Sequence, residues 1–428
     1  MSTTSHNHDH DDVLGDLMRG SLDHCVKCTI CEQYCPVSAV TPLFPGPKYA
    51  GPQSERFRTD EASVDHSVDY CSGCGICTQV CPQGVHIAEI NSRARAKMKN
   101  DDGVPLRDRI ITRSEILGRL GTPVAPLANA TLRSRPLRAV GERLLGIHRD
   151  APVPAFAGRT LRAWGKKHVA SVPTTDRVVF FYGCGADYYE PRLGEMAVEV
   201  LEHNGFAVDM PKQGCCGLPL QSSGLFDDAR RYVRKLAHNL APSVRSGAHI
   251  VAVSTSCALM LKREAIEILG LEDDAELRLV SGRVRDICEF LVDLHDDGRL
   301  RTDFSPVEAS VVYHAPCQQQ GHGIGKPALE LFGLIDGLKV VESESRCCGI
   351  AGTYGLKREK YDIAMAVGKP LFDQIRDVAP GLVACDSETC RWQIHKASGV
   401  TSVHPVEILH RAYGLGDDPG GSGINGHS

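Results

Sequence analysis

The sequence predicts a multidomain α+β protein, with an N-terminal domain organised by two four-cysteine motifs and two copies of an α/β unit after it. Three observations support this fold class. The 428 residues contain 18 cysteines, and eight of them form two C-x2-C-x2-C-x3-C-P motifs near the N-terminus. Further cysteines recur in the second half at spacings of 132 or 133 residues. A chain of this length can form several separate cores.

The two N-terminal motifs have the cysteine spacing of bacterial two-cluster ferredoxins. In such motifs, three closely spaced thiolates bind one [4Fe–4S] cluster and the fourth thiolate binds the other cluster. The alternatives are four-thiolate zinc sites or disulfides, although structural zinc usually takes two separated cysteine pairs. We therefore assign the first cluster to Cys25, Cys28, Cys31 and Cys81, and the second to Cys71, Cys74, Cys77 and Cys35.

Composition excludes several classes of protein. The chain is 42% hydrophobic, yet no apolar run approaches the roughly 18 residues that a membrane-spanning helix needs. Residues 1–17 have neither the basic nor the apolar region of a signal peptide, so we expect a cytoplasmic protein with reduced cysteines. The net charge of −5 gives no reason to expect nucleic-acid binding.

Both ends of the chain are expected to be disordered tails, at residues 1–20 and 415–428. The first tail contains His6, His8 and His10, for which metal binding is the alternative interpretation. The second is rich in glycine.

Residues 101–172 are predicted to connect the N-terminal domain, residues 21–100, to the second half. Residues 91–170 contain 17 lysines and arginines against 6 aspartates and glutamates, and several prolines interrupt the segment. Amphipathic stretches lie at residues 110–120 and 137–147. Basic amphipathic helices can bind an anionic bilayer surface. The alternatives are a solvated basic face or a docking surface for an acidic partner.

The second half is an internal duplication, predicted at residues 173–300 and 301–414. In each repeat an apolar strand leads to a cysteine, a helix and a second strand lead to Cys-Cys-Gly, and a third strand leads to a cysteine at a helix start. Strands that alternate with helices predict parallel sheets. The predicted strands are 178–182, 206–210 and 249–253 in repeat 1, and 310–313, 339–342 and 381–384 in repeat 2.

The repeated cysteines all follow predicted strands and should meet at one end of each sheet, where parallel sheets bind ligands. Gly217 and Gly349 would permit a positive φ or a close backbone approach there. We expect an iron–sulfur or other redox site in each repeat, with merely buried cysteines as the alternative. Cys288 lies in an apolar helical stripe and is expected to be a core residue. The candidate metal ligands are Cys184, Cys215, Cys216 and Cys257 in repeat 1, and Cys317, Cys347, Cys348 and Cys390 in repeat 2.

Motifs for other cofactors are missing from the sequence. There is no GxGxxG sequence between a strand and a helix, no P-loop and no HExxH. We therefore expect no flavin or nicotinamide on this chain, predict no catalytic residue, and expect no substrate oxidation without another subunit.

These motifs resemble the iron–sulfur subunits of heterodisulfide reductases, glycolate and lactate oxidases, and anaerobic glycerol-3-phosphate dehydrogenase. Several segments are most similar to the C subunit of the last of these: residues 23–29 (DHCVKCT), 44–48 (FPGPK), 50–52 (AGP), 93–97 (RARAK) and 388–393 (ETCRWQ). The resemblance extends from about residue 21 to about residue 413.

The resemblance implies an electron-transfer subunit with a helical ferredoxin domain. In the family, a flavoprotein partner oxidises sn-glycerol 3-phosphate to dihydroxyacetone phosphate, and electrons pass through this subunit to menaquinone in anaerobic respiration. A peripheral position at the inner face of the cell membrane is then expected. The alternatives are the same role with glycolate, lactate or a disulfide as substrate, or a cluster-based redox sensor.

The chain departs from the family pattern in one respect. The Cys-Cys-Gly domain of the family typically ends in C-x2-C, whereas here Ser254 precedes Cys257 and Ser387 precedes Cys390. This puts a five-thiolate noncubane cluster in doubt and argues against disulfide-reductase chemistry, but four thiolates suffice for an ordinary cluster. The serines are expected to be weak oxygen ligands or helix caps, and Cys385 could replace the missing thiolate of repeat 2.

Overall fold

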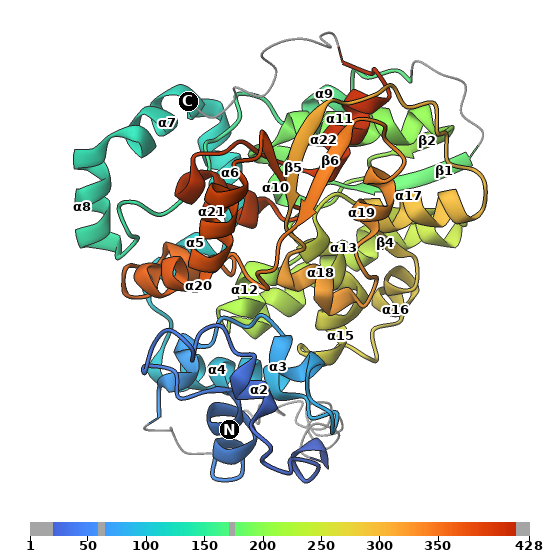
Figure 1. The fold of residues 1–428 in the computed structure, drawn as a ribbon. Helices are drawn as coiled ribbons and strands as arrows, with labels where there is room; N and C mark the ends of the chain where they lie inside the picture. The colour runs from blue at the N-terminus through green and yellow to red at the C-terminus, as the bar shows by residue number, and fades with distance from the viewer. Residues whose placement is uncertain (1–19, 59–64, 171–175, 417–428) are drawn as a thin grey trace, which may run out of the picture.

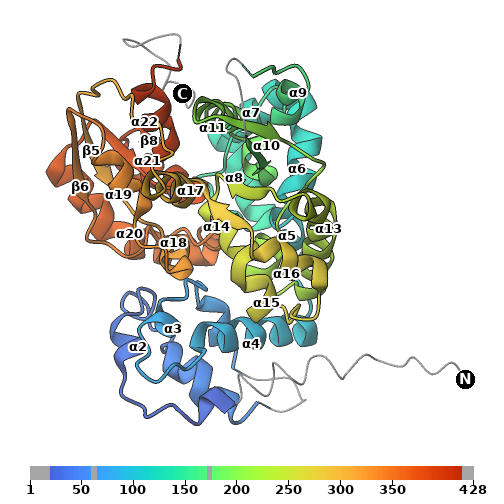
Figure 2. The same cartoon turned by 90° about the vertical axis from the view of Figure 1, so that its right-hand side faces the viewer.

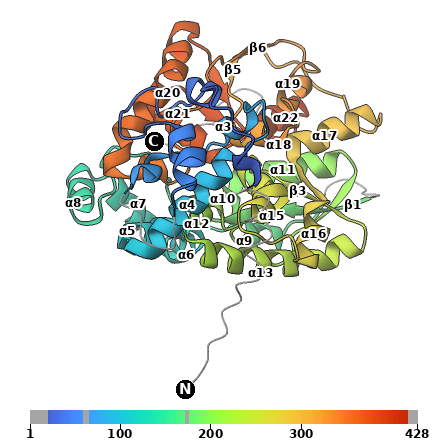
Figure 3. The same ribbon diagram turned by 90° about the horizontal axis from the view of Figure 1, so that it is seen from below.

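The computed structural model describes residues 20–58, 65–170 and 176–416. The predicted tail with His6, His8 and His10 lies outside the described residues, as does nearly all of the predicted C-terminal tail. The N-terminal domain lies at one end of the molecule, and the two α/β repeats lie beside each other above it (Figure 1). Viewed from below, the N-terminal domain lies across both repeats (Figure 3). The exact domain limits stay predictions.

The regular elements in the described part of the N-terminal domain are all helices, as the resemblance implied. The third cysteine of each motif lies in a short helix, Cys31 in α2 and Cys77 in α3, and these two helices pack together. The longest helix, α4, is buried along most of its length. The helices of this domain are α2 Ile30–Gln33, η1 Tyr49–Gln53, η2 Ser67–Tyr70, α3 Ile76–Gln79 and α4 Ile87–Asp102.

The connector is a series of helices. The predicted amphipathic stretch 110–120 is divided between two of them, because Arg113, which separates them, has non-helical dihedral angles (φ −99°, ψ 54°). The stretch 137–147 lies mostly in α8, which ends where Gly146 adopts a φ of 67°. The elements are α5 Leu106–Ile111, α6 Ser114–Gly121, η3 Thr122–Val124, α7 Ala125–Arg133, α8 Arg135–Leu145 and α9 Leu161–Gly165.

Repeat 1 contains a four-stranded parallel sheet in the order β2-β1-β3-β4. The three predicted strands are present, with ends shifted by at most two residues. The strands are β1 Asp176–Phe181, β2 Phe206–Asp209, β3 His249–Ala252 and β4 Val284–Asp286. The helices are α10 Gly183–Tyr188, α11 Pro191–His203, α12 Leu218–Ser222, α13 Phe226–Arg245, α14 Thr255–Leu259, η4 Met260–Glu264, α15 Ala265–Glu267, α16 Ala275–Ser281 and α17 Ile287–Asp296.

Repeat 2 has the equivalent strand order, β6-β5-β7-β8, again parallel, so the duplication holds for the fold as well as the sequence. The strands are β5 Ala309–Tyr313, β6 Leu338–Glu342, β7 Leu382–Ala384 and β8 Ser402–Val403. The helices are α18 Cys317–His322, α19 Pro327–Phe332, η5 Tyr354–Leu356, α20 Arg358–Val378, α21 Glu388–Ser398 and α22 Pro405–Ala412.

The two repeats share one hydrophobic core. Phe180 and Leu201 of repeat 1 belong to the same buried cluster as Tyr313, Phe332 and Leu409 of repeat 2. Helix α11 of repeat 1 packs against α22 of repeat 2, and the two sheets stand side by side (Figure 2). Apolar burial of this extent favours a fixed arrangement of the repeats.

Buried ion pairs join the N-terminal domain and the connector to repeat 2. Lys360 donates to Asp69 Oδ2 (2.6 Å), and Lys357 donates to Asp108 Oδ2 (3.0 Å). Asp69 also pairs with Lys99 of α4 (3.3 Å). Both lysines of repeat 2 and Asp108 are buried, so each charge requires its partner.

Candidate functional site

The eight N-terminal cysteines form two groups, and each group contains the last cysteine of the other motif. Burial, together with Glu32 and the thiols of Cys25, Cys81 and Cys28, raises the pKa of Cys31 to about 11. Burial together with the thiols of Cys74, Cys71 and Cys35 raises the pKa of Cys77. Cys81 therefore lies with the first motif and Cys35 with the second. Thiols that crowd together in this way favour a metal centre, since metal ions bind the thiolate form.

The two cysteine loops have the same backbone conformation. Residues two and four positions after the first cysteine have positive φ in both loops: Lys27 (61°) and Thr29 (68°), then Gly73 (71°) and Gly75 (79°). Left-handed residues within a loop form N–H-lined concavities that bind anions and iron–sulfur groups. The sequence predicts this conformation only in the second loop, where both positions are glycines.

The four predicted cysteines of repeat 1 meet at the carboxyl end of the sheet. Cys184 lies in the first turn of α10, and Cys257 lies in the first turn of α14. Cys184 donates to Cys215, and Cys216 Sγ donates to Cys257 Sγ (3.2 Å). The Gly217 N–H donates to Cys215 Sγ (3.4 Å). The hydrogen bond from Cys184 holds the pKa of Cys215 well below its usual range.

The predicted cysteines of repeat 2 meet in the same way. Cys317 donates to Cys347, and Cys348 donates to Cys390. The Gly349 N–H donates to Cys347 Sγ (3.3 Å). The positive φ expected after each cysteine pair is confirmed, at 85° for Gly217 and 89° for Gly349.

The serines are not helix caps in the structure. Ser254 and Ser387 precede α14 and α21, but neither side chain accepts a hydrogen bond from its helix. The Ser254 hydroxyl instead donates to Glu388 Oε2 (2.9 Å), a half-buried carboxylate from repeat 2. Ser387 interacts with the Thr389 hydroxyl (3.4 Å). The helix-cap interpretation is therefore wrong, because each hydroxyl has a side-chain partner.

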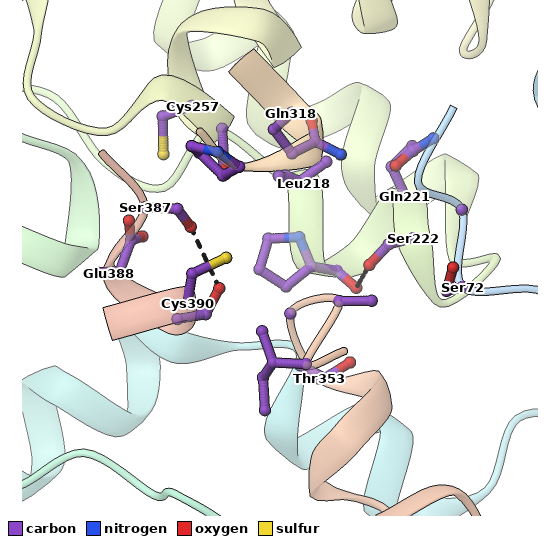
Figure 4. A pocket seen from close by; sticks show the side chains of 18 of the residues that line it. Ser72, Leu218, Gln221, Ser222, Cys257, Gln318, Thr353, Ser387, Glu388 and Cys390 are labelled. Carbon is purple, nitrogen blue, oxygen red and sulfur yellow. Dashed lines mark hydrogen bonds between the residues drawn. The ribbon is translucent and has the colours of Figure 1, made fainter. Parts of the chain in front are cut away.

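A cavity of about 420 Å³ lies where the N-terminal domain meets both repeats. Cys257 and Cys390 project into it from opposite sides (Figure 4). Its lining is mainly apolar, and its thiols come from all three parts of the chain. The thiols are those of Cys74, Cys184, Cys215, Cys216, Cys257, Cys317, Cys347, Cys348 and Cys390. A donor set made of thiols and backbone N–H groups fits iron–sulfur clusters, whose ligands are cysteine thiolates.

Cys288 is fully buried, as expected of a core residue, but its surroundings are polar. One ligand atom each of Asp286, Cys288 and Asp386 lies within 4.8 Å of the others. Burial, reinforced by Asp386, raises the pKa of Asp286 to about 8. Sequence reasoning missed this cluster because the two aspartates belong to different repeats.

Comparisons with known proteins agree with this architecture. The 4Fe-4S dicluster domain family matches residues 21–85, and the cysteine-rich domain family matches residues 178–262 and 311–395. The fold and its thiols thus define an iron–sulfur protein with a dicluster ferredoxin domain and two cysteine-rich domains. The eight cysteines of the dicluster domain imply two [4Fe–4S] clusters.

One relative covers nearly the whole chain. The C subunit of anaerobic glycerol-3-phosphate dehydrogenase from Escherichia coli (strain K12) is 38% identical over 402 residues, which are 92% of this chain and 98% of the relative. The chain belongs to the family of this C subunit, and its membership implies partner subunits.

More distant relatives share part of the chain. The B subunit of the fumarate reductase (CoM/CoB) of Methanothermobacter marburgensis is 31% identical over 60% of this chain and 51% of its own length. Lactate utilization protein A 1 of Bacillus mycoides is 27% identical over 58% of this chain and all of its own length. Among the described residues, no helix combines the length and the apolar character needed to cross a membrane.

Proposed function

We propose that this chain carries electrons from a flavoprotein subunit that oxidises sn-glycerol 3-phosphate toward menaquinone or another quinone. The observation that carries the proposal is the uninterrupted series of cysteine groups from the N-terminal domain into the repeats. A bound [4Fe–4S] cluster supplies one-electron chemistry to each group. The 38% identity to a glycerol-3-phosphate dehydrogenase subunit supports the substrate.

The contacts between groups support an order for the relay. The thiol of Cys74, in the second N-terminal group, lies close enough to Cys347 and Cys317 for their charges to interact. Tyr354 packs in the same buried cluster as Cys71 and Cys347. The second N-terminal group therefore adjoins repeat 2, and repeat 1 follows across the shared cavity.

Charged and aromatic side chains pack closely where the second N-terminal cysteine group meets repeat 2. Lys360 lies 5.5 Å from the Tyr70 ring centre and 5.1 Å from that of Tyr354, and it donates to Asp69 next to them. The Tyr354 hydroxyl donates to the Tyr70 carbonyl (3.0 Å). These contacts hold the N-terminal domain against repeat 2.

The exposed face of the connector is proposed to rest on an anionic bilayer. Leu120, Leu127 and Leu144 are 67%, 72% and 76% exposed on α6, α7 and α8, with exposed arginines close in sequence. Helices α7 and α8 project from the edge of the molecule, away from the sheets (Figure 1). Apolar side chains with basic neighbours are the composition of surface-bound helices.

Anaerobic purification with iron and sulfide analysis tests the relay. We expect about 8 iron atoms from the N-terminal domain alone and two reducible [4Fe–4S] signals in electron paramagnetic resonance (EPR) spectra. Menadione, a soluble quinone, should reoxidise the reduced protein. Fewer than two reducible centres, or bound zinc in their place, would contradict the proposal. Reduced clusters that menadione does not reoxidise would favour a redox sensor.

A separate experiment identifies the substrate that the flavoprotein partner oxidises. The likeness to lactate utilization protein A keeps a hydroxyacid such as lactate or glycolate as the second candidate. The flavoprotein that co-purifies with the chain decides between them, because it should reduce the clusters with only one of glycerol 3-phosphate, lactate and glycolate.

A further inference from the structure

The two repeats differ in the number of cysteines in their thiol groups. Repeat 2 has a fifth cysteine, Cys385, directly after strand β7. With the 133-residue spacing that relates Cys257 to Cys390, its counterpart in repeat 1 is Ala252. The serines Ser254 and Ser387 are counterparts of each other, so they do not distinguish the repeats. The extra thiol is specific to repeat 2.

Cys385 contacts the thiol group of its repeat. It is fully buried and belongs to the same hydrophobic cluster as Cys348 and Cys390. Its thiol donates a hydrogen bond to Cys390, which also accepts one from Cys348. Cys385 is therefore a third thiol in the hydrogen-bonded group that contains Cys348 and Cys390.

The backbone around Cys385 places its thiol near the other thiols of repeat 2. Cys385 directly follows the last residue of β7 and lies two residues before Ser387. Its N–H donates to the Val403 carbonyl of β8 (3.0 Å). A thiol at position 385 therefore lies at the same end of the sheet as Cys348 and Cys390, with which it shares a buried cluster.

A buried cation lies beside Cys385. The Arg391 side chain is buried, and its Nη1 donates to the Cys385 carbonyl (3.0 Å). Its guanidinium pairs with Glu190 of repeat 1, and its charge also interacts with the Cys385 thiol group. The counterpart of Arg391 in repeat 1 is Ala258, so repeat 1 lacks the cation as well as the thiol. A nearby cation lowers the cost of a buried thiolate.

We propose that Cys385 is a fifth thiolate ligand in repeat 2, so that the two repeats bind iron–sulfur centres of different ligation. Repeat 1 then supplies four thiolates, and repeat 2 supplies five. Cys385 loses its thiol proton on ligation, as any cysteine ligand does. The inference rests on the proposed function only in requiring an iron–sulfur centre in repeat 2.

The test compares EPR spectra and iron content of the full chain purified without oxygen. C390S identifies the repeat 2 signal as the one it removes. We expect C385S to abolish or shift this signal, with a loss of up to about 4 iron atoms per chain. S387A removes no thiol, only hydrogen bonds to Cys390 and Thr389, and should retain the signal, and C385S/S387C should restore it. The matched control is C288S, which alters a buried cysteine outside the thiol groups.

Three results would overturn the proposal. The first is an unchanged repeat 2 signal in C385S. The second is loss of that signal in S387A, which would make the serine oxygen the ligand. The third is loss of the repeat 2 signal in C385S with no recovery of that signal in C385S/S387C. The two N-terminal signals report separately on folding and on the relay, so failure of this inference is distinguishable from failure of the proposed function.

Discussion

The glycines after the two Cys-Cys pairs occupy equivalent sequence positions but different steric surroundings. A Cβ atom at Gly349 would lie 1.9 Å from the Ala364 carbonyl oxygen, whereas one at Gly217 would lie 3.2 Å from the Ala229 carbonyl oxygen. Both have positive φ. Helix α20 therefore approaches its Cys-Cys-Gly loop more closely than α13 approaches the corresponding loop.

We expect G349A to destabilise the protein by roughly 3 kcal/mol or more, because a displaced backbone adds to the cost of the left-handed conformation. G217A should cost about 1–2 kcal/mol, mainly from its φ. Denaturant unfolding of the two variants checks the difference. Equal losses of unfolding free energy in G349A and G217A would show that the structure relieves the contact with the Ala364 carbonyl oxygen at no energetic cost.

The N-terminal loops provide a second matched pair. Thr29 is β-branched and has a φ of 68°, while its counterpart Gly75 has a φ of 79°. We expect T29G to stabilise the first loop by about 0.5–1 kcal/mol and G75A to destabilise the second by about 1 kcal/mol. The denaturant midpoint for loss of cluster absorbance measures both. Destabilisation by T29G would show that the Thr29 hydroxyl bond to the Cys28 carbonyl (2.6 Å) outweighs the strain.

At the scale of elements, buried charges join the connector to repeat 2. Asp108 is fully buried against Lys357, so D108N leaves the lysine charge without its closest partner. We expect a loss of about 3–5 kcal/mol in the free energy of unfolding. D373N removes the partner of the surface residue Lys369 and should cost below about 1 kcal/mol. Comparable losses in the two variants would contradict the role of this pair.

The π-helical turn η4 carries a buried carboxyl with a predictable pH effect. Burial, followed by the charges of Glu89 and Glu267, raises the pKa of Glu264 to about 8, against a smaller opposing effect of Arg263. Between about pH 4.5 and 8 the folded protein keeps a proton that the unfolded chain has lost, so stability falls as pH rises.

E264Q removes this dependence. Relative to the parent protein, we expect little change at about pH 5 and a gain on the order of 2 kcal/mol at about pH 9. Urea midpoints at the two pH values measure it. A gain of the same size at both would mean that Glu264 does not titrate in this window.

Sequence patterns predicted six of the eight strands found in the part of the chain that the structure describes, because apolar runs of four or five residues before a cysteine are distinctive. Strands β4 and β8 have only three and two residues, too few for periodicity to reveal. The stretch 110–120 is divided at Arg113, whose non-helical dihedral angles (φ −99°, ψ 54°) no sequence pattern indicates. Spacing also predicted the gathering of thiols within each repeat, since parallel strands end at one edge.

At the scale of the whole molecule, no sequence signal places the N-terminal domain against repeat 2. That placement depends on Asp69 and Lys360, which lie 291 residues apart. Tertiary contacts between distant residues, rather than local preference, determine this placement. For Cys385, by contrast, the sequence alone indicated a candidate for the missing thiolate of repeat 2, and its hydrogen bond to Cys390 agrees with that position.

The exposed face of the connector determines how the whole molecule would bind an anionic bilayer. We expect the full chain to co-sediment with phosphatidylglycerol vesicles and to dissociate as ionic strength rises, because the attraction is between surface charges. L127E/L144E should weaken binding about tenfold or more. F57E, which changes an exposed side chain of the N-terminal domain, is the control. Equal loss in F57E, or no binding by the parent chain, would contradict the proposed face.

The cavity lies between the N-terminal domain and the two repeats, and this position has a consequence for how clusters are inserted into the protein. Both repeats direct their thiols into a space that Cys74 and its neighbours close from one side. We expect cluster-assembly machinery to reach the repeats before this domain docks. Insertion of iron and sulfide would then proceed from the C-terminal half toward the N-terminus, opposite to the direction of synthesis.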